Sequence, residues 1–208
     1  MILKSDVKAI KKKIDYYNII SFDVFDTLLC RKTSIKKVFF EVKKRSEREG
    51  IYISDFYKRR CEAEEKARKL SEYGEVTIEE IYQQFIGIND KQKQVLCNIE
   101  QEVEFQVMQI HEIGKELYDY AMMKEKKIII VSDMYLPIEF IESVLKKNGY
   151  YGYSRLYVSS NERVKKRSGK LFKVVGAQYD IKQMIHIGDN PISDWLYSRL
   201  NGITSMLL

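Results

Sequence analysis

The sequence predicts an α/β protein in which a Rossmann-like core with a parallel sheet carries an inserted run of helices. One observation is that short apolar runs alternate, from residue 126 to residue 208, with helical patterns of about ten residues, which is typical of a parallel sheet covered on both faces. The other is that residues 33–125 are polar, helical in pattern and poor in strand signals. We therefore expect an α/β core formed by residues 1–32 and 126–208, and a helical insertion over residues 33–125.

The first elements follow from the spacing of apolar residues. Val7, Ile10 and Ile14 lie at helical spacing, so residues 5–16 are predicted to form a helix. The run "YNIISFDVF" comes next and is predicted to include a buried strand that leads into the acid Asp23.

Cap and stop signals divide the insertion into helices. Two helices are expected in "IKKVFFEVKKRSEREG" and "SDFYKRRCEAEEKARKLSEYG", because each run ends at a glycine. The run "TIEEIYQQFIG" begins with Thr77 and has Glu80 three residues later, which is the pattern of a capping box. A long helix is expected over about residues 91–123.

The last part of the chain alternates between strand and helix. Strands are expected in "KKIIIVSD", "RLYVSS", "MIHIGD" and "ITSMLL". Helices are expected between them in "PIEFIESVLKKNG", "SGKLFKVVGAQY" and "ISDWLYSRLNG". This is the order of elements expected for a doubly covered parallel sheet.

Composition narrows the class of protein. The chain has 208 residues, 45% of them hydrophobic, and no apolar run near the roughly 20 residues that span a bilayer. Its net charge is +6, but the basic residues are spread among acids, which favours solvated helix faces over a nucleic-acid groove. Three widely spaced cysteines indicate reduced thiols, so we expect a cytoplasmic protein without a membrane span and without a nucleic-acid partner.

Acidic residues follow three of the expected strands. Asp23, Asp133 and Asp189 each come at or just after a strand, and Asp194 follows five residues after Asp189. In parallel sheets, ligands bind beyond the carboxyl ends of the strands. Each acid could be only a helix cap, and Asp133 is equally well explained as a cap or turn residue. Three acids at one sheet edge would repel one another unless a cation or a reaction requires them.

Taken in order, these segments resemble the motifs of the haloacid dehalogenase (HAD) superfamily, whose members are mostly Mg²⁺-dependent phosphohydrolases. "FDVFDTLL" is similar to the first motif, which implies Asp23 as the nucleophile and Thr27 as a hydroxyl that fixes the loop and the phosphate. "IIIVSDMY" is similar to the second, which implies Ser132 and Asp133 at the phosphate. The insertion falls where many members carry a helical cap.

The third and fourth motifs complete the resemblance. "KRSGKLF" is similar to the third motif and implies Lys166 as the active-site lysine, although Lys165 and Lys170 are close in sequence. "IHIGDNPISDW" is similar to the fourth and implies Asp189 and Asp194 as acids of the Mg²⁺ site. Asp23 and the backbone carbonyl of Phe25 would complete the set of hard oxygen ligands that Mg²⁺ prefers.

One position departs from the pattern of the superfamily. Most of its phosphatases have a second Asp two residues after the nucleophile, as general acid and base, whereas this chain has Phe25 there and Asp26 one residue later. Residues three apart in extended backbone point to different sides, so Asp26 replaces the missing acid only if the backbone turns sharply. An aromatic at this position is similar to the haloalkanoic acid dehalogenases, which lack the Mg²⁺ site that "GDNPISD" resembles.

Several residues of the insertion have two interpretations. Arg60 and Glu64 lie one helical turn apart, which favours pairing on the helix face, although Arg59 or Arg60 could instead contact an anionic substrate. Glu100 and Glu104 are also one turn apart, which favours two solvated acids.

Two further side chains are expected to be structural. Tyr82 is expected to pack in the interior, as most of the aromatic residues are. His186 lies inside an expected strand and shows no metal-ligand spacing, although it is close to Asp189.

The resemblance extends to a bacterial subgroup of HAD-like hydrolases found beside, or fused to, glycosyltransferases of polysaccharide synthesis. It is carried by runs such as "RRCEAEEKAR", "EIYQQF" and "YVSSNERVKKRSGKLF". The function that this implies is an Mg²⁺-dependent phosphohydrolase acting through an aspartyl-phosphate on a small phosphorylated metabolite such as a sugar phosphate. The alternative is a catalytically weak domain that binds a phosphorylated ligand or serves a glycosyltransferase as a scaffold, and a metal-free dehalogenase is the third hypothesis.

Overall fold

The fold is known from a computed structural model, which describes the backbone of residues 4–208 and the side chains from residue 7 onward. The first three residues of the expected core range 1–32 lie outside the described residues. Over the part of the chain that is described, no helix has the length and apolar character needed to cross a membrane.

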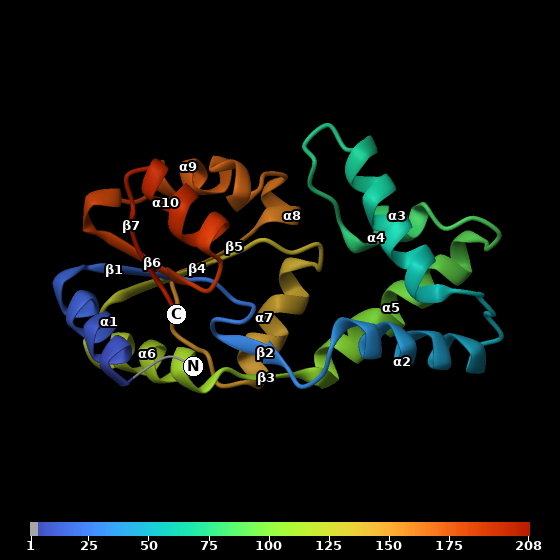
Figure 1. Cartoon of the computed structure of the whole chain (residues 1–208), viewed down its shortest axis with the longest axis horizontal. Coiled ribbons are helices and arrows are strands. Elements are labelled where there is room, and N and C mark those ends of the chain that lie inside the picture. Colours follow the sequence, from blue (N-terminus) through green and yellow to red (C-terminus); the bar gives the residue numbers. More distant parts are fainter. Residues whose placement is uncertain (1–3) are drawn as a thin grey trace.

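The core is a five-stranded sheet in the order β5-β4-β1-β6-β7, and every strand pair in it is parallel. The strands are β1 (Ile19–Phe22), β4 (Lys127–Ser132), β5 (Arg155–Val158), β6 (Met184–Gly188) and β7 (Thr204–Leu207). Central β1 pairs with β4 and β6, and Ile19 lies in register with both Lys127 and Met184. The predicted α/β fold class with a parallel, Rossmann-like sheet is confirmed (Figure 1).

Helices cover both faces of this sheet, as the buried strands require. One face carries α1 (Lys4–Tyr16), α6 (Glu112–Met123) and α7 (Ile138–Lys147), and the other carries α8 (Ser159–Glu162), α9 (Lys170–Gly176) and α10 (Tyr197–Leu200). Side chains alternate along β4, so Ile130 packs in one buried cluster with Leu117 of α6, while Ile129 packs in another with Phe172 of α9.

The inserted region contains α2 (Ile35–Arg48), α3 (Phe56–Leu70), α4 (Ile78–Gln83) and α5 (Asp90–Val107), which pack mainly against one another. They lie to one side of the sheet in Figure 1. The predicted capping box at α4 is confirmed, because the Thr77 hydroxyl accepts from the Glu80 amide and the Glu80 carboxylate accepts from the Thr77 amide. The division of the chain into two domains at residues 33 and 125 stays a prediction.

The long helix expected over residues 91–123 is wrong. The chain leaves α5 after Val107 and forms a short strand, β3 (Met108–Ile110), which pairs antiparallel with β2 (Leu29–Arg31). The ring of His111 then caps α6 by accepting a hydrogen bond from the amide of Gly114. Because α6 packs against α1 and β4, it belongs structurally with the sheet. The β2–β3 pair is where the chain enters and leaves α2 to α5 (Figure 1).

Three elements near the site differ from the strands and helices that the sequence predicts. The strand in "RLYVSS" ends at Val158, and its two serines begin α8. The segment "KRSGKLF" starts with a 3₁₀ turn at Lys166–Ser168 before α9. The helix expected in "ISDWLYSRLNG" is a π-helical turn at Pro191–Leu196 followed by α10, and a further 3₁₀ turn at Ile181–Gln183 precedes β6.

Candidate active site

Three of the predicted acids meet at the carboxyl edge of the sheet. Asp23 follows β1 and Asp189 follows β6, which are neighbouring parallel strands. The carboxylate oxygens of Asp23, Asp189 and Asp194 lie within 4.8 Å of one another. They line a cavity of about 330 Å³, whose other lining residues are Phe25, Asp26, Asp133, Lys166, Arg167, Asn190 and Ser193. The acids that are far apart in sequence therefore form one concave cluster.

Asp194 is held by the loop that carries it. Its Oδ2 accepts a hydrogen bond from the backbone amide of Asn190 at 3.0 Å, and the Asn190 side chain in turn caps the π-helical turn by accepting from the amides of Ile192 and Ser193. A methyl group on Gly188 would lie 2.5 Å from the carboxyl carbon of Asp194, so this position has no room for a side chain. The segment "GDNPISD" thus adopts a turn in which its last acid, Asp194, packs against the end of β6.

Lys166 provides the positive charge inside the cluster. Its ammonium, on a side chain only 2% exposed, contacts the carboxylate of Asp23 and lies 2.5 Å from Oδ1 of Asp194. Asp133 fixes the turn that presents this lysine, because its carboxylate accepts from the amides of Lys166 at 2.7 Å and Arg167 at 3.3 Å. The interpretation of Asp133 as a cap or turn residue therefore has a structural basis, and its contact with phosphate stays a prediction.

The neighbouring lysines lie elsewhere. The ammonium of Lys165 is 3.4 Å from where a β-carbon on Gly74 would be, so it lies beside the loop between α3 and α4. Lys170 is an exposed residue at the start of α9. Among Lys165, Lys166 and Lys170, Lys166 is the one whose ammonium contacts Asp23.

The buried charges shift one another's pKa values. Burial raises the pKa of Asp23 to about 8, even though the charge of Lys166 acts to lower it. Burial also acts to raise the pKa of Asp194, but the charge of Lys166 and the hydrogen bond from His186 outweigh it and hold that pKa below its usual range. Burial acts to lower the pKa of Lys166, but the charges of Asp23 and Asp194 outweigh this effect. The pKa of Lys166 is therefore raised above its usual value, and the ammonium stays charged. The single ammonium of Lys166 does not balance the charge of three ionised carboxylates, those of Asp23, Asp189 and Asp194.

The donor set fits a hard divalent cation. Asp23, Asp189 and Asp194 offer only carboxylate oxygens, which are the ligands that Mg²⁺ prefers, and they converge closely enough to share one ion. The backbone carbonyl of Phe25 belongs to a residue that lines the same cavity, and its place in the ligand set stays a prediction.

Two predicted phosphate ligands are buried hydroxyls without partners. Thr27 and Ser132 are fully buried, and neither hydroxyl oxygen has a hydrogen-bond partner among the residues that the structure describes. An unsatisfied buried hydroxyl costs roughly 1–3 kcal/mol. Neither residue is among those that line the 330 Å³ cavity, so their contact with phosphate stays a prediction.

The turn at Asp26 decides where the second acid lies. Asp26 has a positive φ of 57°, and its amide donates to the carbonyl of Leu29, so the backbone turns sharply directly after Phe25. Asp26 is exposed and lines the same cavity as Asp23. The ring of Phe25 is half-buried and lies 5.6 Å from the guanidinium of Arg31. The condition under which Asp26 could reach the site, a sharp turn, is therefore met.

The pairs expected in the insertion have mixed outcomes. Arg60 pairs with Glu64 at 3.0 Å as expected, and Tyr82 is fully buried as expected. The expectation that Glu100 and Glu104 are solvated is wrong, because both are fully buried. Glu100 accepts two hydrogen bonds from Arg60, at 2.8 and 2.9 Å, and one from the Tyr82 hydroxyl.

Glu104 has a different partner. Both of its oxygens accept from Nε of Arg31, at 2.9 and 3.1 Å. The sequence did not indicate these two acids as buried, because Arg60 and Arg31 lie 40 and 73 positions away from them.

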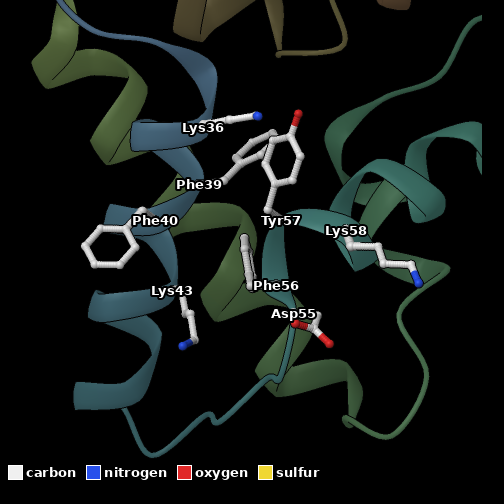
Figure 2. A pocket seen from close by; sticks show the side chains of 8 residues that line it. All are labelled: Lys36, Phe39, Phe40, Lys43, Asp55, Phe56, Tyr57 and Lys58. Atoms are coloured by element: carbon white, nitrogen blue, oxygen red, sulfur yellow. The ribbon is translucent and has the colours of Figure 1, made fainter.

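A larger cavity, of about 450 Å³, lies away from the acids (Figure 2). Its walls come from α2 and the start of α3, with Phe39 and Phe56 buried and Phe40 and Tyr57 exposed. Three lysines and one aspartate complete its lining: Lys36, Lys43, Lys58 and Asp55. It contains none of the residues predicted to carry chemistry.

Comparison with known proteins supports the fold. No protein-family model and no curated protein matches the chain. Among solved structures, the 2-haloacid dehalogenase from Pseudomonas syringae is 13% identical with a TM-score of 0.68, covering 91% of this chain and 85% of that one. YfnB from Bacillus subtilis, a HAD-family protein solved with magnesium, is 16% identical with a TM-score of 0.64, covering 91% and 87%.

A third neighbour was solved with magnesium and inorganic phosphate. This HAD-family enzyme from Bacteroides thetaiotaomicron is 16% identical with a TM-score of 0.58, covering 92% of this chain and 93% of that one. At such identities the likeness concerns the fold, and the fold is that of the HAD-family hydrolases.

Proposed function

We propose that the chain is an Mg²⁺-dependent phosphohydrolase that forms an aspartyl-phosphate on Asp23. The observation that carries the proposal is the convergence of Asp23, Asp189 and Asp194 within 4.8 Å of one another, with the ammonium of Lys166 in contact with Asp23 and Asp194. Asp189 is exposed, but buried carboxylates such as Asp23 and Asp194 are costly unless they serve a cation or a reaction. The two unpartnered hydroxyls of Thr27 and Ser132 support a polar ligand at the same edge of the sheet.

Each residue then has a distinct role. A carboxylate oxygen of Asp23 attacks phosphorus, the bond to the leaving oxygen breaks, and water later hydrolyses the acyl phosphate. Lys166 holds Asp23 and the phosphoryl oxygens by charge, and the hydroxyls of Ser132 and Thr27 donate hydrogen bonds to the phosphate. Asp23, Asp189, Asp194 and the Phe25 carbonyl would hold Mg²⁺, which would supply the positive charge that keeps Asp23 ionised and offsets the charge of the phosphate.

The mechanism also needs a general acid that protonates the leaving oxygen. Phe25 cannot transfer a proton, and Asp26 is the carboxylate that the sharp turn brings to the cavity. We propose Asp26 as the group that protonates the leaving oxygen where that oxygen needs a proton. A positioned general acid contributes roughly 10²–10⁴ in rate.

The helices α2 to α5 are proposed to act as the cap that selects the substrate. Helix α4 contacts loops of the site, because the amide of Ile78 donates to the carbonyl of Tyr135 and Glu80 pairs with Arg163 at 2.8 Å. Tyr135 and Arg163 belong to the loops that carry Asp133 and Lys166. A small phosphorylated metabolite such as a sugar phosphate, in a pathway that includes a glycosyltransferase, is the substrate class that we propose.

One set of assays tests the mechanism. An aryl phosphate, whose leaving group needs little protonation, and an alkyl phosphate are compared with and without Mg²⁺. We expect Asp23→Asn to abolish turnover of both esters while leaving the fold intact, as checked by circular dichroism. Asp26→Asn should lower turnover of the alkyl ester by about 10²–10⁴ and hardly change the aryl ester. Unchanged activity of Asp23→Asn would contradict the mechanism.

A second candidate function follows from Phe25. A site that binds phosphate but lacks a competent acid would act as a phospholigand-binding or scaffolding domain. Turnover of neither ester, together with Mg²⁺-dependent binding of inorganic phosphate, would favour this candidate.

A further inference from the structure

His186 links two strands to one acid of the site. It lies fully buried in β6. Its Nδ1 lies 2.8 Å from the hydroxyl oxygen of Ser21, its register partner in β1. Its Nε2 lies 3.2 Å from Oδ1 of Asp194. The ring also packs edge-on against Phe172, with centroids 5.0 Å apart at an interplanar angle of 75°, so its orientation is fixed by packing as well as by hydrogen bonds.

The carboxylate beside Nε2 sets the position of the ring proton. A carboxylate ionised beside Lys166 can only accept, so Nε2 of His186 must carry the hydrogen that is donated to Asp194. Burial favours the neutral ring, and its Nδ1 then accepts the hydroxyl hydrogen of Ser21, which is itself 1% exposed. The bonds run in one direction, from Ser21 to His186 and from His186 to Asp194.

These bonds complete the restraint on the Asp194 carboxylate. Oδ2 accepts from the amide of Asn190, and Oδ1 accepts from Lys166 on one side and His186 on the other. Without His186, Oδ1 would keep only the hydrogen bond from the ammonium of Lys166.

We propose that His186, oriented by Ser21, is a positioning residue that sets the Asp194 carboxylate for the cation and for Lys166. The inference rests on the proposed function, because it assigns Asp194 to the Mg²⁺ site. Groups that orient a metal ligand through hydrogen bonds commonly change metal affinity or activity by about 10–100-fold when they are removed.

The chain offers a matched control. Ser205 in β7 is the register partner of His186 on its other side and is likewise 1% exposed. Its hydroxyl donates to the carbonyl of Trp195, so it lies outside the Ser21–His186–Asp194 series. Ser21→Ala and Ser205→Ala therefore remove the same atom at the same level of the sheet, and only the first removes a bond to His186.

The first experiment uses the metal-free protein and does not depend on turnover. Nitrogen-15 NMR of the imidazole should show a hydrogen on Nε2 and none on Nδ1 in the wild type. In Ser21→Ala the hydrogen should stay on Nε2, but the Nδ1 signal should move toward that of a nitrogen that accepts no hydrogen bond, whereas Ser205→Ala should keep the wild-type signature. A wild-type ring with its hydrogen on Nδ1, or an Nδ1 signal that Ser21→Ala leaves unchanged, would overturn the inference.

The second experiment measures Mg²⁺ affinity by calorimetry. His186→Phe should weaken binding by about 10–100-fold. His186→Gln, which can still donate to Asp194, should restore part of the loss. Ser21→Ala should weaken binding in the wild type but add nothing in the His186→Phe background, and thermal unfolding confirms that each variant is folded.

The two hypotheses can fail separately. Wild-type protein that binds no Mg²⁺ would overturn the proposed function and the role of His186 with it. If the wild type binds Mg²⁺ and folded His186→Phe binds it equally well, only the positioning role is overturned. Equal losses in Ser21→Ala and Ser205→Ala would likewise refute the positioning role, because they would assign the effect to general packing.

Discussion

Gly114 of α6 packs directly against the main chain of Thr27. A methyl group on its α-carbon would lie 1.8 Å from the Thr27 carbonyl oxygen and 2.8 Å from the carbonyl carbon. The loop from Asp23 to Thr27 thus packs against α6, which the sequence predicts to be continuous with α5. Because backbone rather than a flexible side chain is in the way, one added carbon must move the loop or the helix.

We expect Gly114→Ala to destabilise the protein by about 1–3 kcal/mol and to lower turnover, because overpacking shifts the loop that carries Asp23. Alanine would otherwise stabilise a helix by about 1 kcal/mol relative to glycine. Urea unfolding and the aryl phosphate assay measure both effects. Gly176→Ala in α9 is the control, since its new carbon would meet only the γ2 methyl group of Ile181, at 3.1 Å. A stabilised Gly114→Ala would show that the contact does not exist.

Lys166→Met is expected to reduce Mg²⁺-dependent turnover by at least about 10², because it removes the ammonium shared by Asp23 and Asp194. Lys165→Met is the matched control, because its ammonium lies beside Gly74. Steady-state kinetics of both variants at saturating Mg²⁺ decides between the two lysines. A larger loss in Lys165→Met would transfer the role to the neighbouring residue.

The pair between Glu80 and Arg163 should make stability depend on pH. The hydrogen bond from Arg163 holds the pKa of Glu80 below its usual value of 4.5. The pair therefore contributes stability above about pH 4.5, and the contribution is lost as the pH falls through the lowered pKa. Since both side chains are partly exposed, we expect Glu80→Gln to cost at most about 1 kcal/mol at pH 7.

Urea midpoints from pH 7 down to pH 3 measure this dependence. The difference between wild type and Glu80→Gln should be largest at pH 7 and should shrink toward the acid end. Glu65→Gln, which removes the partner of Lys69 on the exposed face of α3, controls for general charge effects. A difference that grows on acidification would contradict the assignment.

Arg60 and Glu100 form a fully buried ion pair, with the guanidinium also 4.9 Å from the ring of Tyr135. Arg60→Met should cost about 3–5 kcal/mol, because it leaves the charge of Glu100 buried without its partner. The double variant Arg60→Met with Glu100→Leu should recover most of that loss. Arg45→Met, at a partly exposed pair with Glu41, is the control. Non-recovery in the double variant would show that the charges themselves are needed.

Much of the core could be predicted from the sequence because its signals are local. Apolar runs, glycines and caps mark the strands and helices, and acids after strands indicate the sheet edge where Asp23, Asp189 and Asp194 meet. The β2–β3 pair could not be predicted in this way, because three-residue strands carry too little pattern. The helical pattern also runs on through "VEFQVMQIHEIGKEL", so the break at Met108 depends on the pairing of that strand with β2.

The other omissions depend on long-range partners. Glu100 is buried because Arg60 faces it from another helix. His186 lies beside Ser21 only because of the register of β1 and β6. Lys166 differs from Lys165 through the 3₁₀ turn that Asp133 holds. Such relationships exist only once the sheet has formed, so no local window of sequence contains them.

The β2–β3 pair has a consequence for how much the inserted segment can vary in length and shape. Arg31 and Met108 are register partners, so the chain departs toward α2 and returns from α5 at a single junction. Everything between them is, in topological terms, one large loop on the sheet, and the entropy of closing a loop grows only slowly with its length. Segments of other lengths and shapes could therefore be grafted at this junction while β1, β4 and β6 keep their register. Under the function that we propose, substrate choice by α2 to α5 and bond-breaking chemistry at the sheet edge can thus diversify separately.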